Sequence, residues 1–285
     1  MSIILQLSLG IVLSIVSPIH NNHEPTSDEK IIFTDEFEQE AAIPDTTVWR
    51  LCQYGNNAWA QHFKHVDGYE NVRVEDGVLK LKASKENGTY KNGGIRTRIG
   101  FPCGTRLEVK AKLAKRIRGG FLAIWQMPIN APQWPRGGEV DLMEWVQGTP
   151  MDIYQTVHTY FINGEQDSSG MTNPDRPTNF DVTDYHIYAA ERTEDAVIFY
   201  IDGKETWRYA NQYLPKEQMQ YPFCDYMYDI ILNFSLGGEL NGNSTWPGKI
   251  HDEDLPGEMW IDWVRITLEE FYKLKHCSTV VYMVS

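Results

Sequence analysis

Hydrophobic and polar residues alternate along most of this chain. Between residues 104 and 114, apolar side chains occupy every second position from Leu107 to Leu113, and charged side chains stand between them. A period of two places one set of side chains on each face of an extended chain, which is typical of a half-buried β-strand. The alternation therefore predicts a strand with one face in a hydrophobic core.

Two pairs of alternating runs meet at Asp-Gly dipeptides, Asp76-Gly77 and Asp202-Gly203. This dipeptide between two such runs is typical of a tight β-hairpin turn. Many short strands with almost no helical periodicity predict an all-β protein, either a sandwich or a barrel. Only residues 211–219 are expected to form a short helix. The remaining expected strands cover residues 93–98, 121–127, 139–145, 153–160, 185–192, 228–236 and 258–268.

The chain has 285 residues, which allows one large domain or two small ones at roughly 100–200 residues per domain. No internal repeat or linker divides it. Residues 3–16 are apolar but too short to span a bilayer, and a polar stretch follows them. We therefore expect a signal peptide over residues 1–20 and a secreted or periplasmic protein that does not enter a membrane.

Charge and aromatic content narrow the choice of partners. Lysine and arginine number 26 and aspartate and glutamate number 39, so the formal net charge is −13. This balance argues against nucleic acid, anionic membrane surfaces and sulfated polymers as main partners, because a polyanion would be repelled. The 9 tryptophans and 15 tyrosines exceed what a core of this size needs. Surplus amphipathic rings of this kind often line sites for flat, hydroxyl-rich ligands.

The four cysteines are Cys52, Cys103, Cys224 and Cys277. Their wide spacing, without a Cys-x-x-Cys pair, argues against a zinc site. An exported protein could form disulfides, and four cysteines allow three pairings. Four buried thiols are the alternative, and the sequence does not choose between them.

Three acids, Glu139, Asp141 and Glu144, fall within an otherwise apolar strand. In a regular strand Glu139 and Asp141 share a face and Glu144 points the other way. A β-bulge at Leu142-Met143 would bring all three to one surface. The two glutamate Cα atoms would then lie roughly 13 Å apart, and inward-leaning side chains would bring the carboxyls to about 5 Å, as retaining glycosidases require.

A solvated face or a calcium site is the simpler interpretation of such an acidic triplet. Two observations favour chemistry. The residues between the acids are all apolar, so the triplet is not part of a polar surface run. Three tryptophans, Trp125, Trp134 and Trp145, also lie close in sequence. Aromatic faces suit the apolar faces of sugar rings, and carboxylates suit glycosidic chemistry.

The spacing Glu-x-Asp-x-x-Glu of residues 139–144 resembles that of glycoside hydrolase family 16, in the bulged form of laminarinases and β-1,3(4)-glucanases. The resemblance covers residues 31–268. It implies a concanavalin-like jelly-roll sandwich of two antiparallel sheets with an open concave cleft, in one catalytic domain over residues 25–270, followed by a tail, 271–285, without an assigned role. The segments that carry it are 31–38, 74–83, 93–98, 121–128, 134–145, 156–160, 185–203, 230–238 and 259–266.

The resemblance also implies roles for the acids. Glu139 would be the nucleophile, Glu144 the general acid and then the general base, and Asp141 the residue that hydrogen-bonds the nucleophile and adjusts its ionisation. Neighbouring carboxylates repel, so one pKa of such a group is raised and that acid can carry a proton near neutral pH.

Further residues are expected to line the cleft. The tryptophans have core packing as their alternative, His158 a buried hydrogen-bonded role, and Arg96 a structural role. Asn233 heads an Asn-x-Ser sequon that burial in a sheet would make silent. The full set expected to bind substrate is Trp125, Trp134, Trp145, His158, Arg96, Asn233 and Trp246.

No cofactor is required for the expected chemistry. Members of the family often hold one structural calcium on the convex side, and Glu36, Gly77 and Asp262 could correspond to its ligands. Hard oxygen ligands suit calcium, but no local motif supports the site.

These expectations combine into a monomeric, endo-acting, retaining hydrolase of a neutral β-glucan, either β-1,3-linked or mixed β-1,3/1,4-linked. Two alternatives remain. One is a hydrolase of a red-algal galactan such as agar or carrageenan, and the other is a non-catalytic β-glucan-binding lectin on the same fold. The intact acidic triplet favours an enzyme over the lectin, and the acidic net charge favours a neutral glucan over a sulfated galactan.

Overall fold

The computed structural model describes residues 29–269, except residues 40, 54, 56, 67, 165–169, 241, 242 and 245. The expected signal peptide at 1–20 and tail at 271–285 lie outside the described residues. Within these ranges, no helix has both the length and the apolar character needed to cross a membrane.

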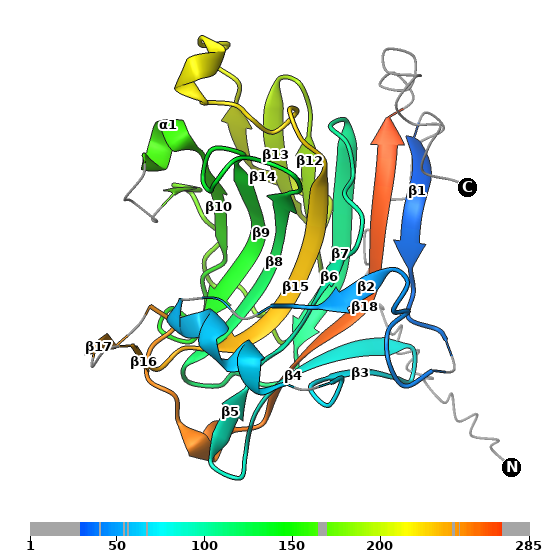
Figure 1. Cartoon of the computed structure of the whole chain (residues 1–285), viewed down its shortest axis with the longest axis vertical. Helices are drawn as coiled ribbons and strands as arrows, with labels where there is room; N and C mark the ends of the chain where they lie inside the picture. Colours follow the sequence, from blue (N-terminus) through cyan, green and yellow to red (C-terminus); the bar gives the residue numbers. More distant parts are fainter. Residues whose placement is uncertain are drawn as a thin grey trace, which may run out of the picture.

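Two antiparallel sheets form most of the described chain and enclose one main hydrophobic core (Figure 1). The first sheet has the order β14-β13-β12-β7-β18-β4-β3, with β1 added to β18 and β5 to β4. Its strands are β1 (Glu29–Asp35), β3 (Val72–Glu75), β4 (Val78–Glu86), β5 (Thr89–Lys91), β7 (Thr105–Leu113), β12 (His186–Arg192), β13 (Ala196–Ile201), β14 (Lys204–Ala210) and β18 (Gly257–Glu269).

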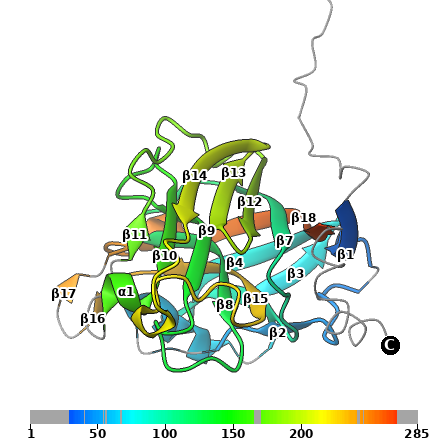
Figure 2. The ribbon, with the colours of Figure 1, turned by 90° about the horizontal axis from the view of Figure 1, so that it is seen from above.

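The second sheet has the order β11-β10-β9-β8-β15-β6-β2 and carries the acidic triplet on the interior strand β9. Figure 2 shows this sheet from above, with β9 between β8 and β10. Its strands are β2 (Trp49–Leu51), β6 (Gly93–Thr97), β8 (Gly120–Pro128), β9 (Glu139–Val146), β10 (Tyr154–His158), β11 (Met171–Thr172) and β15 (Tyr228–Leu236). The expected all-β sandwich is confirmed.

Both Asp-Gly dipeptides form the expected hairpin turns. Asp76 and Gly77 have φ of 55° and 72°, and they join β3 to β4. Asp202 and Gly203 have φ of 51° and 76°, and they join β13 to β14. Positive φ at both central residues gives a two-residue turn whose twist matches that of the strands.

Short helical segments and one small hairpin lie outside the two sheets. The expected helix over residues 211–219 is wrong, because only Lys216–Gln218 forms a single 3-10 turn, η2. Pro215 precedes this turn and Met219, with a left-handed φ of 50°, ends it. The other segments are η1 (Ala58–His65), α1 (Tyr160–Asn163), β16 (Glu239–Leu240), β17 (Asn243–Ser244) and η3 (Asp252–Asp254).

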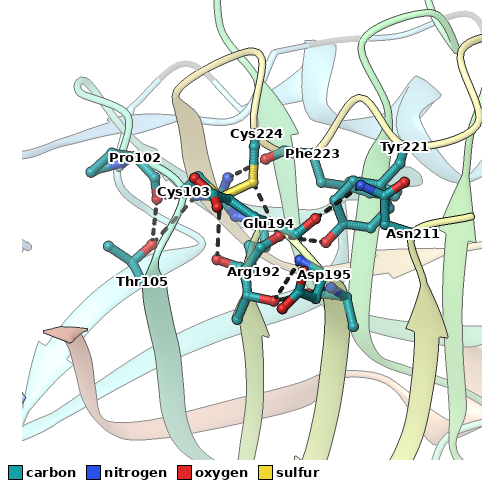
Figure 3. The surroundings of a disulfide bond; sticks show 12 residues. Pro102, Cys103, Thr105, Arg192, Glu194, Asp195, Asn211, Tyr221, Phe223 and Cys224 are labelled. Atoms are coloured by element: carbon teal, nitrogen blue, oxygen red, sulfur yellow. Dashed lines mark hydrogen bonds between the residues drawn. A yellow bond between two sulfur atoms is a disulfide. The ribbon is translucent and has the colours of Figure 1, made fainter. Parts of the chain in front are cut away.

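A disulfide joins Cys103 and Cys224 and closes a separation of 121 residues (Figure 3). This is one of the three pairings that the sequence left open. Cys52 is a free thiol, and Cys277 lies outside the described residues. Beside the disulfide, fully buried Arg192 donates hydrogen bonds to the carbonyl oxygens of Phe101, Pro102 and Phe223 at 2.8–2.9 Å. The disulfide joins the segment at Cys103 to the segment at Cys224, and the Arg192 hydrogen bonds hold both segments at the end of β12.

Replacing both disulfide cysteines, as Cys103→Ser with Cys224→Ser, should lower the free energy of unfolding by about 2–4 kcal/mol, because the unfolded chain regains the freedom of a long loop. Denaturant unfolding measures the change. The wild-type protein unfolded under reducing conditions should match the double variant. Equal stability of variant and oxidised wild type would contradict the disulfide.

Candidate active site

A β-bulge in β9 brings the three acids to one face. β9 pairs with β8 through Ile124 opposite Met143 and then Trp125 opposite Asp141, so Leu142 has no partner on β8. Leu142 and Met143 are both buried in the core between the sheets. Two successive inward residues return Glu144 to the face of Glu139 and Asp141. The predicted bulge is confirmed.

The acids line a cleft of about 770 Å³ over the second sheet. Aromatic residues supply much of its wall, and no lysine or arginine is found among the described residues that line it. The lining residues are Asn57, Trp59, Phe121, Ala123, Trp125, Met127, Trp134, Glu139, Asp141, Glu144, Tyr154, Thr156, His158, Thr172, Asn233 and Trp246.

The aromatic rings of the cleft pack edge to face. Trp59 lies 6.0 Å from Trp125 and 5.6 Å from Phe121, and Trp246 lies 5.1 Å from Phe121 and 5.8 Å from Tyr154, between ring centroids. Such contacts fix the orientation of each ring. The cleft therefore presents a preset aromatic surface of the kind that stacks on sugar rings.

Polar neighbours hold each acid. Trp134 Nε1 donates a hydrogen bond to Glu139 Oε2. His158 Nε2 lies 3.4 Å from Asp141 Oδ2, and Thr156 Oγ1 lies 3.4 Å from Glu144 Oε2. The neighbouring strand β10 thus supplies the contacts to Asp141 and Glu144, and Trp134 supplies the contact to Glu139.

The entry to β9 is tightly packed. Gly138 has a φ of 82°, and a Cβ on it would lie 2.6 Å from the Tyr228 hydroxyl and 3.0 Å from Cε1 of Phe223. Tyr228 donates its hydroxyl proton to the carbonyl oxygen of Gly137. Only glycine fits the conformation and the space, so the position of Glu139 is set by the chain that precedes it.

Burial raises the pKa of all three acids. The pKa of Glu139 rises to about 8, mainly by burial and then by the charge of Asp141, while His158 and the Trp134 hydrogen bond oppose the rise. Burial also raises the pKa of Asp141, and burial followed by the charge of Asp141 raises that of Glu144 well above its ordinary value. Glu139 and Glu144 keep part of their surface open to the cleft. A cluster with raised pKa values can hold a proton near neutral pH, as a general acid requires.

The structure brings five of the seven expected substrate residues into the cleft: Trp125, Trp134, His158, Asn233 and Trp246. Asn233 is 1% exposed, accepts a hydrogen bond from Trp125 Nε1 at 2.8 Å and donates one to Ser235 Oγ. It therefore holds the Trp125 ring, and its buried position leaves no room for a glycan on the sequon.

Two of the expected residues are not in the cleft lining. Trp145 is fully buried in the core and donates to the carbonyl oxygen of Pro150 at 3.0 Å. It follows Glu144 on a strand, so it must face the opposite side. Arg96 forms an ion pair with Asp229 on β15, and its Nε donates at 2.8 Å. Its guanidinium is thus engaged by the protein.

Sequence reasoning missed other cleft residues. Phe121 shares a strand face with Trp125 on β8, two steps of two residues away, so alternation could have identified it. Trp59 lies on η1, whose start at Asn57 has no side-chain cap, so the sequence carried no helical signal there.

Two of the three expected calcium ligands, Glu36 and Asp262, pair with cationic side chains, and the third, Gly77, lies in the turn between β3 and β4. Glu36 Oε1 accepts a hydrogen bond from Arg265 at 3.0 Å, and Asp262 pairs with Lys110 at 2.8 Å. Calcium stays a prediction, and no step of the reaction is derived through it.

Within the part of the chain that the structure describes, Glu139, Asp141 and His158 form a group with metal-ligand chemistry. One ligand atom of each lies within 4.8 Å of the others. All three line the cleft, and two of them belong to the acidic triplet.

Comparison with known proteins gives the family. The model of the glycosyl hydrolases family 16 matches residues 59–265, which include the bulged strand and the cleft. The chain belongs to glycosyl hydrolases family 16. The family resemblance seen in the acidic spacing is thereby confirmed.

Three relatives of this family-16 chain differ in what they act on. A solved structure from work on endo-acting O-glycanases, with which human gut microbiota initiate mucin breakdown, is 67% identical with a TM-score of 0.83, over 84% of this chain and 100% of that chain. A keratan-sulfate endo-1,4-β-galactosidase of Sphingobacterium multivorum is 29% identical over 85% of this chain, which spans 56% of that relative's length. A β-glucanase of Rhodothermus marinus is 29% identical over 83% of this chain and 84% of the relative.

Burial of the acids predicts an unusual dependence of stability on pH. Because the folded pKa of Glu144 lies above its ordinary value of 4.5, the folded state holds more protons, and stability is lost as pH rises from 4.5 toward the raised pKa. Glu144→Gln removes the buried charge and should raise the free energy of unfolding by about 1–2 kcal/mol at pH 8, with little change at pH 4.5.

Denaturant unfolding at the two pH values measures this difference. Glu217→Gln, on the exposed η2 turn, is the matched control and should have the same effect at both pH values. A Glu144→Gln effect that does not depend on pH would contradict the burial of a charge.

Proposed function

We propose that this chain is an endo-acting, retaining glycoside hydrolase that cleaves β-galactosidic bonds inside neutral glycan chains of the mucin type. The observation that carries the proposal is the bulge of β9, which places Glu139, Asp141 and Glu144 together on the floor of an aromatic cleft. Two carboxyl groups on one strand face can flank a scissile glycosidic bond, one to attack the anomeric carbon and the other to protonate the leaving oxygen on the opposite face of the ring, as a double-displacement reaction requires.

In this reaction Glu139, as carboxylate, attacks the anomeric carbon, and Glu144 donates its proton to the departing glycosidic oxygen. The glycosyl–Glu139 ester then forms, and Glu144, now a carboxylate, takes a proton from the water that hydrolyses the ester. The Trp134 hydrogen bond stabilises the anionic form of Glu139. Besides burial, the charge of Asp141 raises the pKa of both glutamates and so adjusts their ionisation.

The relatives support a galactosidic substrate. The 67% identical structure concerns O-glycanases that initiate mucin breakdown, and the keratan-sulfate relative is an endo-1,4-β-galactosidase. Both kinds of glycan carry β-linked galactose. The β-glucanase of Rhodothermus marinus is 29% identical, the same identity as the keratan-sulfate relative, so the 67% identical structure is the comparison that favours galactose over glucose.

The cleft itself favours unsulfated chains. Sulfate groups call for arginine or lysine, because charge-assisted hydrogen bonds offset the desolvation of the anion. No such side chain lines the described cleft, whose three acids would repel a sulfate. We therefore propose a neutral galactose-containing stretch as the substrate, and we retain β-glucan as the second candidate because of the β-glucanase relatives.

Mucin-type glycans are extracellular, so this proposal includes export by the signal peptide expected at residues 1–20. We also propose that the protein acts as a monomer.

A substrate panel tests the proposal. The purified protein should release oligosaccharides with reducing-end galactose from an unsulfated galactose–N-acetylglucosamine polymer and from mucin O-glycans. Turnover of keratan sulfate, laminarin and barley glucan should be at least about tenfold lower, because they add sulfate or lack galactose. Chromatography and mass spectrometry identify the products, with Glu144→Gln as the inactive control.

Two outcomes would overturn this assignment. Efficient cleavage of laminarin or barley glucan, without action on galactose chains, would establish the β-glucan substrate. Binding of any of these glycans without new reducing ends would establish a lectin.

Substitutions of the acids test the mechanism. Glu139→Gln and Glu144→Gln should each lower kcat by at least about 10²-fold, because each removes a reacting group. Asp141→Asn should be milder and should mainly change the pH profile, because it removes a charge next to the nucleophile. More than about a tenth of wild-type activity in either glutamine variant would refute the assigned roles.

A further inference from the structure

Asn163 is a buried residue that does not line the cleft, but it contacts His158, which does. Asn163, at the end of α1, is 5% exposed, and its Nδ2 lies 3.2 Å from Nδ1 of His158. The Asn163 Oδ1 accepts a hydrogen bond from the backbone N–H of Thr159 at 3.2 Å. Because the amide oxygen is engaged there, the NH₂ group is the part that faces the imidazole.

This orientation determines the tautomer of His158. An amide N–H can only donate, so Nδ1 must accept and the ring proton must be on Nε2. Nε2 faces Asp141 Oδ2 at 3.4 Å, and that buried oxygen has no hydrogen-bond partner. The distance is long for a hydrogen bond, but catalytic contacts often tighten only when substrate is bound. The contact with Asn163 thus directs the Nε2 proton of His158 toward Asp141 Oδ2.

A second contact connects α1 to the loop that supports the nucleophile. The guanidinium of Arg136 lies over the ring of Tyr160 on α1, 3.9 Å from its centroid. Two residues before Arg136, Trp134 donates its hydrogen bond to Glu139. The Arg136–Tyr160 contact therefore connects the loop that carries Trp134, the partner of Glu139, to helix α1, which carries Asn163.

Gly170 also packs closely against His158. A Cβ on this glycine would lie 2.6 Å from Cε1 and 2.8 Å from Nδ1 of His158. The imidazole is thus confined between Asn163, Gly170 and the Trp134 ring, whose centroid lies 5.5 Å away. A confined ring keeps the hydrogen-bond roles that its neighbours impose.

We propose that Asn163 is a positioning residue that holds His158 as an Nε2–H donor toward Asp141, and that the Arg136–Tyr160 stack keeps α1 in the place where Asn163 can do so. The kinetic part of this inference rests on the proposed function. The titratable groups that face His158 are Glu139 and Asp141 across the cleft floor, with Glu144 further along β9. No described lysine or arginine lines this side of the cleft.

The tautomer can be measured without substrate. Nitrogen-15 NMR of the histidine rings, with His158→Gln to assign the His158 signals, should show the neutral ring of wild-type His158 with its proton on Nε2. Asn163→Asp keeps the size and the acceptor for Thr159 but replaces the donor by an acceptor. It should therefore move the proton to Nδ1. A wild-type Nδ1–H ring, or an unchanged ring in Asn163→Asp, would overturn the proposal.

Kinetics test the consequence. Asn163→Asp should lower kcat/KM about tenfold at pH 7 and change the shape of its pH profile, because the proton no longer faces Asp141. Thermal unfolding checks that the variant is folded. A folded Asn163→Asp variant with the wild-type pH profile would overturn the role of Asn163. Absence of hydrolysis by the wild type would instead overturn the proposed function, and the NMR result would still decide the tautomer.

Two substitutions of Tyr160 test the Arg136–Tyr160 stack. Tyr160→Phe keeps the ring under Arg136 and should keep kcat/KM within about twofold, whereas Tyr160→Ala should lower it about fivefold or more. In Tyr160→Ala the His158 signals should report a mixture of tautomers. Equal activity and equal ring signals in the two variants would show that the stack does not position α1.

Discussion

The odd number of residues between Glu139 and Glu144 is the constraint on which the rest of the site depends. A regular strand would put these acids on opposite faces of the sheet. β9 resolves the conflict by sending both Leu142 and Met143 into the core, and each fills space there. The same two residues therefore complete the packing between the sheets and align the carboxyl groups. A substitution that changes the packing of Leu142 or Met143 should also move Glu144 relative to Glu139.

Gathering three carboxyls on a buried strand is costly, because each loses water and each repels the others. The surrounding side chains reduce this cost selectively. Trp134 donates to Glu139, His158 faces Asp141, and Thr156 approaches Glu144. Each contact comes from a different neighbour and reaches a different acid. The cluster can therefore distribute its protons unequally, as a reaction with one nucleophile and one acid requires.

The parts of this structure that follow from local pattern were predictable. Alternation located the strands, Asp-Gly located both hairpins, and the parity of the acids located the bulge. Because side chains alternate along a strand, the residue after Glu144 points into the core, and Trp145 is buried there. Its proximity to the acids in sequence had wrongly suggested a place in the cleft. Contacts between distant segments were not predictable. The Arg96–Asp229 pair, the choice of Cys103–Cys224 and the approach of Trp59 on η1 depend on how the sheets fold over each other.

The tight entry to β9 divides the cleft into a part that resists change and a part that accepts it. Gly138 touches Tyr228 and Phe223, and the chain at Phe223 is tied to Arg192 and followed by the disulfide at Cys224. On the opposite wall, Trp59 and Trp246 come from segments outside both sheets. Those segments can change in sequence and length without disturbing the pairing of the strands that hold the acids, while Glu139 stays anchored to a cross-linked frame.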